Sequence, residues 1–454
     1  MNEDNGGLPP SEEIIARATE NTNEKFIPRE DPNVWWNSLN EGWKKAFKNA
    51  IQLYDGDPNE EQMQRIINLE SLYLYVDQEQ VADITDLSPL FMLNKLMYLT
   101  ASSTRISSIE PISHLTNLKT LEISSTLVAD ISPLANMKNL DYLYMGSSKV
   151  TDISALKNLT NLRSLYMGYN KIKDITPIEN LKMLEILDIS STKIKSLEPL
   201  RNLNRLTNLT AGNLKISSIE PLAGLIRLNY LYLNTSKISD ISPLSNMLHL
   251  SYLDISYTRV TDISPLAKMR KLESLNIGNT DIKTLDGCAG LHNLKNLYAG
   301  NNSITSIEPL RELIDIETLD LNQTEISDLS PISNNINLKY LYLTGTDVKD
   351  LSPIENLYML DYLQLGETPI ENLEPIRKLD NLKSLDMVNT FIKDLSPLEN
   401  CMVLEYVNIS NTFVSTIVPL MNLSKINNIY CYGTNISSEE KKAFKETHPS
   451  VYMD

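Results

Sequence analysis

The chain has 454 residues, 42% of them hydrophobic, and a formal net charge of −17. Because nucleic acids and anionic membrane surfaces are also negatively charged, this balance argues against both as ligands. We expect a soluble chain that neither binds nucleic acid nor inserts into a membrane, and whose length suits an array of repeats.

Residues 1–32 are predicted to form a disordered acidic tail, because polar and acidic residues and prolines dominate this stretch. The first 30 residues also lack the basic start and the apolar segment of a signal peptide. We therefore expect a cytoplasmic protein, or a secreted protein from which a signal peptide has been removed.

Residues 33–68 are predicted to form a helical N-terminal cap. Trp36, Trp43 and Phe47 recur at helical spacing, and Asp57-Pro58 precedes a second predicted helix. All three tryptophans of the chain lie in this segment. Such an aromatic stripe could line a ligand site, but covering the exposed end of a repeat array is its commoner use, and we favour that interpretation.

A 22-residue unit repeats over residues 69–436. In the copy at 118–139, Leu118, Leu121 and Ile123 alternate with polar residues, which predicts a short strand with one buried face. Parallel strands need a crossover between them. Ser132-Pro133 supplies it, since Ser suits a helix N-cap and Pro the first position of an α or 3₁₀ turn. One unit cannot bury enough apolar surface to fold alone, so the stack is the domain.

The proline of this turn recurs at multiples of 22 residues through sixteen consecutive units, with Ala155 and Gly287 in the two vacant positions. The first strand, near residues 69–74, is followed by about five extra residues that predict a loop near 77–81. Beyond the array, residues 437–454 are predicted to form a C-terminal cap. Ser437 and Glu440 match a capping box, Ala443 and Phe444 mark the apolar side of the helix, and Val451-Tyr452 suggests a last edge strand.

The pattern Leu118-x-x-Leu121-x-Ile123, with its Asp-Ile-Ser-Pro-Leu turn, resembles the internalin-like, bacterial, 22-residue class of leucine-rich repeats. The resemblance implies a curved right-handed α/β repeat solenoid with a concave parallel sheet, short 3₁₀ or α turns on the convex side, and a role in binding proteins. One column departs from the family. Its usual Asn is mostly Thr here, with Asn170 and Asn302 as exceptions and Leu214 as a break.

We find no sequence signature of catalysis, of a cofactor or of a metal site. The four histidines are scattered, and no Gly-rich phosphate loop or nucleophile elbow is present. The carboxylates of the turns have a structural explanation at helix starts. Cys288, Cys401 and Cys431 occupy inward columns, where we expect small buried side chains. The chain is therefore predicted not to be an enzyme.

Most of the 21 tyrosines fall in columns that face outward from the strands, and one of these columns returns an acid at every third repeat. Tyrosine simply suits exposed strands, but a continuous aromatic surface with acids and no Lys or Arg also resembles a binding face. We predict that this face binds a protein partner with a basic surface; a glycan-binding module is the alternative. The predicted partner-binding residues are Tyr142, Tyr144, Tyr166, Asp188, Tyr230, Tyr232, Tyr252, Asp254, Tyr298, Asp320, Tyr340, Tyr342, Tyr362 and Asp386.

Two further columns carry charge. The column of Lys119 alternates in sign along the array, which predicts lateral pairing between neighbouring repeats. The edge after the strands is basic at Arg105, Lys149, Lys171, Lys193, Lys215, Lys237 and Arg259. This edge is then acidic at Asp281, Glu325 and Asp347, and it ends with Phe391 and Phe413. A lysine column is usually a solvated surface. The alternative is an acidic partner that docks along this edge and uses the two phenylalanines as an apolar anchor.

Overall fold

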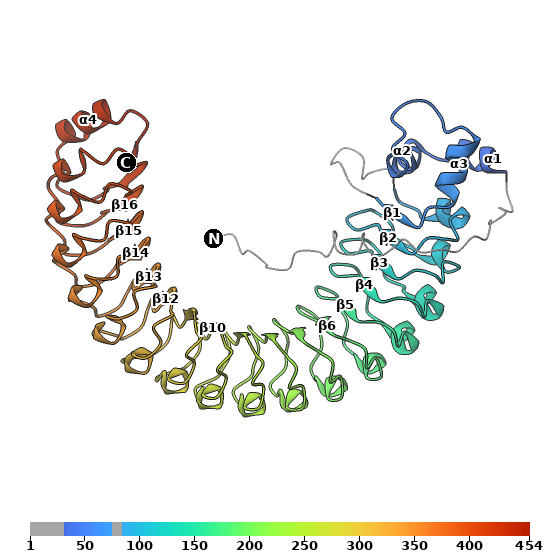
Figure 1. Ribbon diagram of the computed structural model, residues 1–454, viewed down its shortest axis with the longest axis horizontal. Helices are drawn as coiled ribbons and strands as arrows, with labels where there is room; N and C mark the ends of the chain where they lie inside the picture. The colour runs from blue at the N-terminus through green and yellow to red at the C-terminus, as the bar shows by residue number, and fades with distance from the viewer. Residues whose placement is uncertain (1–30, 75–83) are drawn as a thin grey trace.

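The computed structural model of the protein describes residues 31–74 and 84–454. Its strands line the inner side of an open arc and its short helical turns lie on the outer side, with α-helices at both ends of the arc (Figure 1). The predicted curved α/β repeat solenoid, with its concave sheet and its 3₁₀ turns on the convex side, is confirmed.

The described residues contain eighteen strands, which pair in parallel and in chain order. They are β1 (Ser71–Tyr73), β2 (Tyr98–Thr100), β3 (Thr120–Glu122), β4 (Tyr142–Tyr144), β5 (Ser164–Tyr166), β6 (Ile186–Asp188), β7 (Asn208–Thr210), β8 (Tyr230–Tyr232), β9 (Tyr252–Asp254), β10 (Ser274–Asn276), β11 (Asn296–Tyr298), β12 (Thr318–Asp320), β13 (Tyr340–Tyr342), β14 (Tyr362–Gln364), β15 (Ser384–Asp386), β16 (Tyr406–Asn408), β17 (Asn428–Tyr430) and β18 (Tyr452–Met453).

The pairing register follows the sequence period. Leu121 pairs with Leu143, 22 residues later, and the same offset holds for each following pair up to β17. The first pair differs, because Ser71 lies opposite Tyr98, an offset of 27. The five extra residues inferred from the sequence are therefore present, while the predicted loop at 77–81 lies outside the described residues.

Each strand from β2 to β17 is preceded by a 3₁₀ turn. The turns are η3 (Ser88–Met92), η4 (Glu110–Ile112), η5 (Ser132–Asn136), η6 (Ser154–Asn158), η7 (Thr176–Ile178), η8 (Glu198–Leu200), η9 (Glu220–Leu222), η10 (Ser242–Leu244), η11 (Ser264–Leu266), η12 (Asp286–Cys288), η13 (Glu308–Leu310), η14 (Ser330–Ile332), η15 (Ser352–Ile354), η16 (Glu374–Ile376), η17 (Ser396–Leu398) and η18 (Val418–Leu420). Because η6 and η12 form without proline, the proline favours the turn but is not required for it.

The predicted N-cap role of the turn serine is wrong. Ser132 is the first helical residue, and its backbone N–H donates to the carboxylate of Asp130 at 2.8 Å. In the other version of the turn, Ser196 Oγ accepts the N–H of Glu198 at 3.2 Å. In all sixteen turns of the described residues, the backbone N–H of the first helical residue donates to a side-chain oxygen of the residue two positions earlier, at 2.8–3.3 Å. Side chains that bridge two residues in this way form a local turn of their own, which starts the helix.

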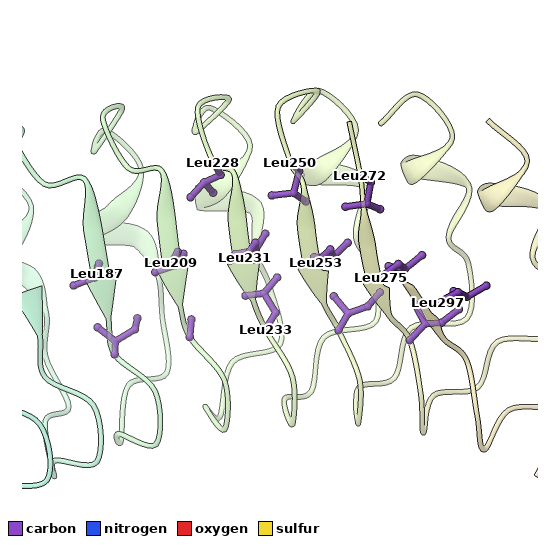
Figure 2. Close-up of a cluster of buried hydrophobic side chains, with 14 of the residues drawn as sticks. Leu187, Leu209, Leu228, Leu231, Leu233, Leu250, Leu253, Leu272, Leu275 and Leu297 are labelled. Atoms are coloured by element: carbon purple, nitrogen blue, oxygen red, sulfur yellow. The ribbon is translucent and has the colours of Figure 1, made fainter. Parts of the chain in front are cut away.

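The interior of the arc is built from aligned leucine columns. Leu187, Leu209, Leu231 and Leu253 follow one another from strand to strand (Figure 2), and each is at most 1% exposed. The three cysteines are buried and free, as the sequence predicted. Burial raises the pKa of the Cys288 thiol to about 12, so this side chain behaves as a small apolar group.

The threonine column and its two asparagines satisfy the backbone differently. Thr324 Oγ1 donates to Leu321 O at 2.6 Å, within its own repeat. Asn302 reaches the preceding repeat as well, because its amide donates to Ile277 O at 2.9 Å and its carbonyl oxygen accepts the N–H of Ile282 at 3.1 Å. The threonines of this column donate to a backbone carbonyl of their own repeat, three residues earlier, so the two asparagines make more backbone hydrogen bonds between neighbouring copies than the threonines do.

We expect Asn302→Ala to lower the free energy of unfolding by about 2–4 kcal/mol, because several buried backbone groups lose their partner. Thr324→Ala removes one local hydrogen bond and should cost only about 1 kcal/mol. Chemical denaturation of both variants tests the difference. Asn302→Thr, which keeps a local bonding option, should fall between them; equal losses for the two alanine variants would contradict this role.

Three α-helices cover the first repeat: α1 (Pro32–Ser38), α2 (Glu41–Ala50) and α3 (Glu60–Ile67). The aromatic stripe is divided between two helices, because the Asn40 side chain accepts the N–H of Trp43 at 2.9 Å and starts α2. Trp35 Nε1 donates to Pro89 O at 3.1 Å and Trp43 Nε1 donates to Asp86 O at 3.2 Å. The tryptophans thus attach these helices to the first turn of the array.

The other end of the arc carries α4 (Ser438–Thr447) and β18. Ser437 Oγ accepts the N–H of Glu440 at 3.1 Å. The Glu440 carboxylate does not complete the predicted capping box but accepts the N–H of Ile417, at 2.6 Å, in the last repeat. Phe444 is buried, whereas Ala443 is exposed and was wrongly placed on the apolar side. The expected edge strand forms at Tyr452–Met453, one residue later than predicted. Among the described residues, no helix has the length and apolarity needed to span a bilayer.

We propose that the helices of residues 33–68 and 437–454 act as caps. Removing residues 1–67 should expose the apolar end of the first repeat, at Leu72 and Leu90, and cause aggregation. Size-exclusion chromatography and thermal unfolding of this fragment are the test, with removal of residues 1–30 as the control. A soluble 68–454 fragment that unfolds cooperatively would contradict the N-terminal cap.

Candidate binding face

The concave face is built from the first and third residues of each strand. In β4, Tyr142 and Tyr144 flank Leu143, which is fully buried. The structure places every predicted partner-binding residue at one of these two positions. These residues lie on β4 (Tyr142, Tyr144), β5 (Tyr166), β6 (Asp188), β8 (Tyr230, Tyr232), β9 (Tyr252, Asp254), β11 (Tyr298), β12 (Asp320), β13 (Tyr340, Tyr342), β14 (Tyr362) and β15 (Asp386).

Ring contacts gather these tyrosines into separate clusters. The Tyr144 and Tyr166 rings stack with centroids 4.5 Å apart and planes at 9°. Tyr252 contacts Tyr232 at 4.5 Å and Tyr230 at 6.4 Å. A third contact joins Tyr342 to Tyr362 at 5.1 Å.

The predicted continuity of the aromatic surface is wrong. At β10 the two outward positions hold Ser274 and Asn276, which separate Tyr252 from Tyr298. At β6 and β7 these positions hold Ile186, Asp188, Asn208 and Thr210. The face therefore presents discrete aromatic contact points, each about one to three strands wide, between small polar side chains.

Three of the predicted tyrosines are exposed, and the others are partly buried. Tyr230, Tyr298 and Tyr340 are 40%, 37% and 39% exposed. Tyr342 is partly buried against its neighbours, and this burial raises its pKa to about 12. Tyr342 is therefore a neutral phenol at physiological pH, and each tyrosine of the face offers a ring for apolar contact and a hydroxyl for hydrogen bonding.

The acids of the face lie deeper than the sequence suggested. Asp254 is only 8% exposed, and its carboxylate accepts the backbone N–H and the hydroxyl of Ser256 at 2.9 and 2.7 Å. Asp188 holds Ser190 in the same way, while Asp320 accepts the N–H of Asn322 at 2.9 Å. Burial raises the pKa of all three carboxyl groups. These acids fasten the bend after the strand, so they contribute less to the accessible surface than the tyrosines do.

That bend has a backbone conformation that sequence reasoning missed. Ser125, Tyr169 and Thr235 have φ of 56°, 57° and 57°, and the same column is left-handed in every complete repeat. The conformation is unfavourable for residues with a Cβ. It directs the N–H of Ser125 to Gly146 O, 2.8 Å away in the next repeat, and so continues the ladder beyond the strand. It also lifts Tyr169 and Tyr257 to exposures of 66% and 60%.

The charged column beside the face pairs laterally, as predicted. Salt bridges join Arg163 to Asp141 at 3.5 Å, Lys295 to Glu273 at 2.9 Å, Lys339 to Glu317 at 2.7 Å and Lys383 to Asp361 at 2.7 Å. The pairs are discrete and do not form a continuous ladder, because Asp361 bonds to Lys383 and leaves Lys339 with Glu317. Most of this column is therefore neutralised within the protein.

Reversing the charge at Lys339 should lower the stability of the fold only slightly. We expect Lys339→Glu to lower the free energy of unfolding by about 0.2–1 kcal/mol at low salt, because one partly exposed pair is lost and a repulsion appears. The loss should shrink in high salt. Lys349→Glu is the control, since no salt bridge joins Lys349 to an acid in the described residues. Equal effects of the two variants in urea denaturation would rule out a contribution from pairing.

The basic edge and its two phenylalanines are accessible to solvent. Lys171, Lys193 and Lys215 are exposed, as are the other basic residues of this column. Phe391 and Phe413 are 49% and 50% exposed and stack with centroids 6.1 Å apart. The structure thus offers two separate surfaces, the tyrosine clusters and this edge.

A fourth tyrosine cluster was not among the predicted site residues. Tyr430 contacts Tyr406 at 5.5 Å and Tyr452 at 5.4 Å, next to the C-terminal helix. The signal was present, because Tyr406 and Tyr430 belong to the same outward columns as the other tyrosines. Within the described part of the chain, no three His, Cys, Asp or Glu side chains are grouped as metal ligands.

Comparison with known proteins agrees with this geometry. Residues 94–136, 138–180, 248–287, 272–312 and 292–334 match the family described as Leucine Rich repeats (2 copies). An internalin from Listeria monocytogenes, InlF, is 29% identical over 84% of this chain and 97% of that chain, with a TM-score of 0.61. The chain therefore contains leucine-rich repeats and is similar to the internalins.

Other leucine-rich repeat structures share the fold. The functional domain of InlJ from Listeria monocytogenes, which includes a cysteine ladder, is 22% identical over 85% of this chain and 82% of that chain, with a TM-score of 0.68. The Arabidopsis receptor kinase HAESA, solved with the peptide hormone IDA and the co-receptor SERK1, is 17% identical over 94% of this chain and 79% of that chain, with a TM-score of 0.66. No curated protein matches the chain. Leucine-rich repeat proteins generally act as protein-interaction scaffolds and are typically not enzymes.

Proposed function

We propose that this internalin-like protein is a non-catalytic module that binds a protein partner on its concave face. The observation that carries the proposal is the placement of the tyrosine clusters at the outward positions of the strands, with Tyr230, Tyr298 and Tyr340 at least 37% exposed. Tyrosine rings bury a large area at a low cost in side-chain entropy, which makes them effective anchors in interfaces. That HAESA was solved with a peptide and a co-receptor supports this use of the fold.

The separation of the clusters suggests how the partner is held. Each cluster would receive one apolar projection of the partner, while the small polar residues between them, such as Ser274 and Asn276, tolerate intervening backbone. The two outward strand columns contain no Lys or Arg. The partner surface that meets this face is therefore expected to be neutral or basic and not acidic, which also disfavours nucleic acid there.

The test uses two double variants against one partner isolated with the full chain. Tyr232→Ala with Tyr342→Ala truncates an anchor in each of two clusters, and should weaken binding roughly a thousandfold if each ring contributes about 2 kcal/mol. Lys171→Glu with Lys193→Glu alters the competing basic edge and should leave the affinity nearly intact. Isothermal titration calorimetry of both variants gives the comparison.

Tyr232→Phe with Tyr342→Phe is the matched control, because it keeps both ring contacts and removes only the hydroxyls. It should retain most of the affinity. If the lysine pair abolishes binding and the tyrosine pair does not, the site lies on the basic edge. If a glycan array gives binding that depends on Tyr232 and Tyr342 while no protein partner is captured, the module recognises glycans instead.

A further inference from the structure

We propose that a hollow beside the amino ends of β7–β10 binds an acidic peptide segment of a partner protein. The hollow has a volume of about 800 Å³ and is lined in part by Thr207, Asn229, Ser251, Arg227 and Lys271. It lies at the edge of the sheet opposite to the lysine column of Lys171. The inference goes beyond the proposed function. The tyrosine clusters could bind a partner without this hollow, and the hollow could bind a peptide without the tyrosine clusters outside it.

The floor of the hollow is a gap in the charged column. Between Glu185 and Glu273, this column holds the uncharged residues Thr207, Asn229 and Ser251. The Thr207 hydroxyl donates to Glu185 O at 3.1 Å and the Ser251 hydroxyl donates to Asn229 O at 3.3 Å. Both hydroxyls are thus turned toward the backbone. The floor carries no charge of its own, unlike the paired acids and bases in the flanking repeats.

The wall of the hollow is basic. Arg227, His249 and Lys271 line the hollow from one column in three successive repeats, and Arg205 holds the same column one repeat earlier, outside the lining; all four are exposed. In the described part of the chain, no salt bridge joins Arg205, Arg227 or Lys271 to a carboxylate. Glu273, the acid that lines the hollow, is already bound to Lys295 at 2.9 Å. A protein with a net charge of −17 therefore displays a local group of uncompensated cations.

One contact within the wall fixes its hydrogen-bonding character. Lys271 Nζ lies 3.1 Å from His249 Nδ1. An ammonium group has only donors, so Nδ1 is the acceptor in this contact. Arg227 and Lys271 offer N–H donors to the hollow. Carboxylates, which accept several hydrogen bonds and carry negative charge, suit such a wall.

Two exposed apolar residues that adjoin wall residues in the chain favour a peptide as the ligand. Ile226 and Leu248 precede Arg227 and His249 in the chain and are 52% and 48% exposed. Tyr230, which lines the hollow, is 40% exposed. A nucleic acid or a sulfated polysaccharide has no aliphatic side chains to cover Ile226 and Leu248. A peptide that combines Asp or Glu with Leu, Ile or Val would meet both the cations and the apolar residues.

The test measures the fluorescence anisotropy of a labelled peptide made of four Glu-Glu-Leu units on titration with the full-length protein. Arg227→Glu with Lys271→Glu should weaken binding at least about tenfold, because two cationic contacts become repulsive. Ile226→Ser with Leu248→Ser should weaken it about threefold to tenfold. A Gln-Gln-Leu peptide and a Glu-Glu-Ser peptide should bind less tightly than the Glu-Glu-Leu peptide by similar factors.

Lys95→Glu with Lys425→Glu is the matched control, since both lysines occupy the same column in distant repeats and the change in net charge is identical. It should alter the affinity less than about twofold. An equal loss in this control, or equal binding of a dodecamer of thymidylate, would overturn the proposal by showing a general attraction to polyanions. No binding of the Glu-Glu-Leu peptide at low salt would overturn it as well.

Two checks separate this site from folding and from the proposed function. Far-UV circular dichroism and thermal unfolding should match the wild type, because Arg227 and Lys271 are exposed. If the glutamate variant does not fold, Arg227→Gln with Lys271→Gln must still weaken peptide binding, or the proposal fails. Tyr342→Ala should leave peptide binding unchanged, so a failure of the tyrosine face would leave this result standing.

Discussion

The structure depends on one constraint, which is that each strand from β2 to β17 must find its hydrogen-bonding partner 22 residues away. Ile123 N donates to Tyr144 O at 2.7 Å, and the left-handed residue Ser125 continues the ladder to Gly146. Because parallel strands require all the intervening chain to cross back over the sheet, the turn and both connections have a fixed length. Stability is therefore shared between neighbours, and no repeat has a core of its own.

This constraint leaves the outward columns free to diverge. The inward Leu231 and the backbone hydrogen bonds keep this strand in place regardless of which side chains occupy the outward positions of Tyr230 and Tyr232. The same argument applies to the edges, where a lysine column, a pair of stacked phenylalanines and a basic hollow occupy different parts of one arc. A single architecture thus displays surfaces of opposite charge within a few repeats of each other.

The sequence predicted what is periodic and local. It gave the strands, the turns, the buried cysteines and the lateral charge pairs, because each follows from the spacing of apolar or charged residues. It missed the break at Asn40 because the aromatic spacing continues through two helices. It misplaced Glu440, whose partner Ile417 is close only after the chain has folded. Ser125 and Thr235 do not by themselves indicate a left-handed backbone, although Gly345 and Gly433 in the same column favour it.

For the binding face, the columns could be predicted but the contacts could not. Tyr144 and Tyr166 stack at 9°, whereas Tyr232 and Tyr252 meet at 31°, and these differences depend on rotamers that neighbouring strands determine. The depth of Asp254 likewise follows from Ser256, which draws the carboxylate toward the bend. The hollow at β7–β10 lies where three repeats lack a charged residue in the charged column beside the face, and the missing charges did not by themselves indicate a binding site.

The unbroken register from β2 to β17 has a consequence for how such a protein changes over time. Deleting or duplicating one whole 22-residue copy joins equivalent backbone positions, so the hydrogen bonds between neighbouring strands remain continuous. A one-residue insertion in a strand would instead turn the side chains that follow it in that strand to the opposite face. The length of the arc can therefore vary only in discrete steps, each about 4.8 Å along the sheet. The spacing between any two contact points on the concave face is restricted to the same increments.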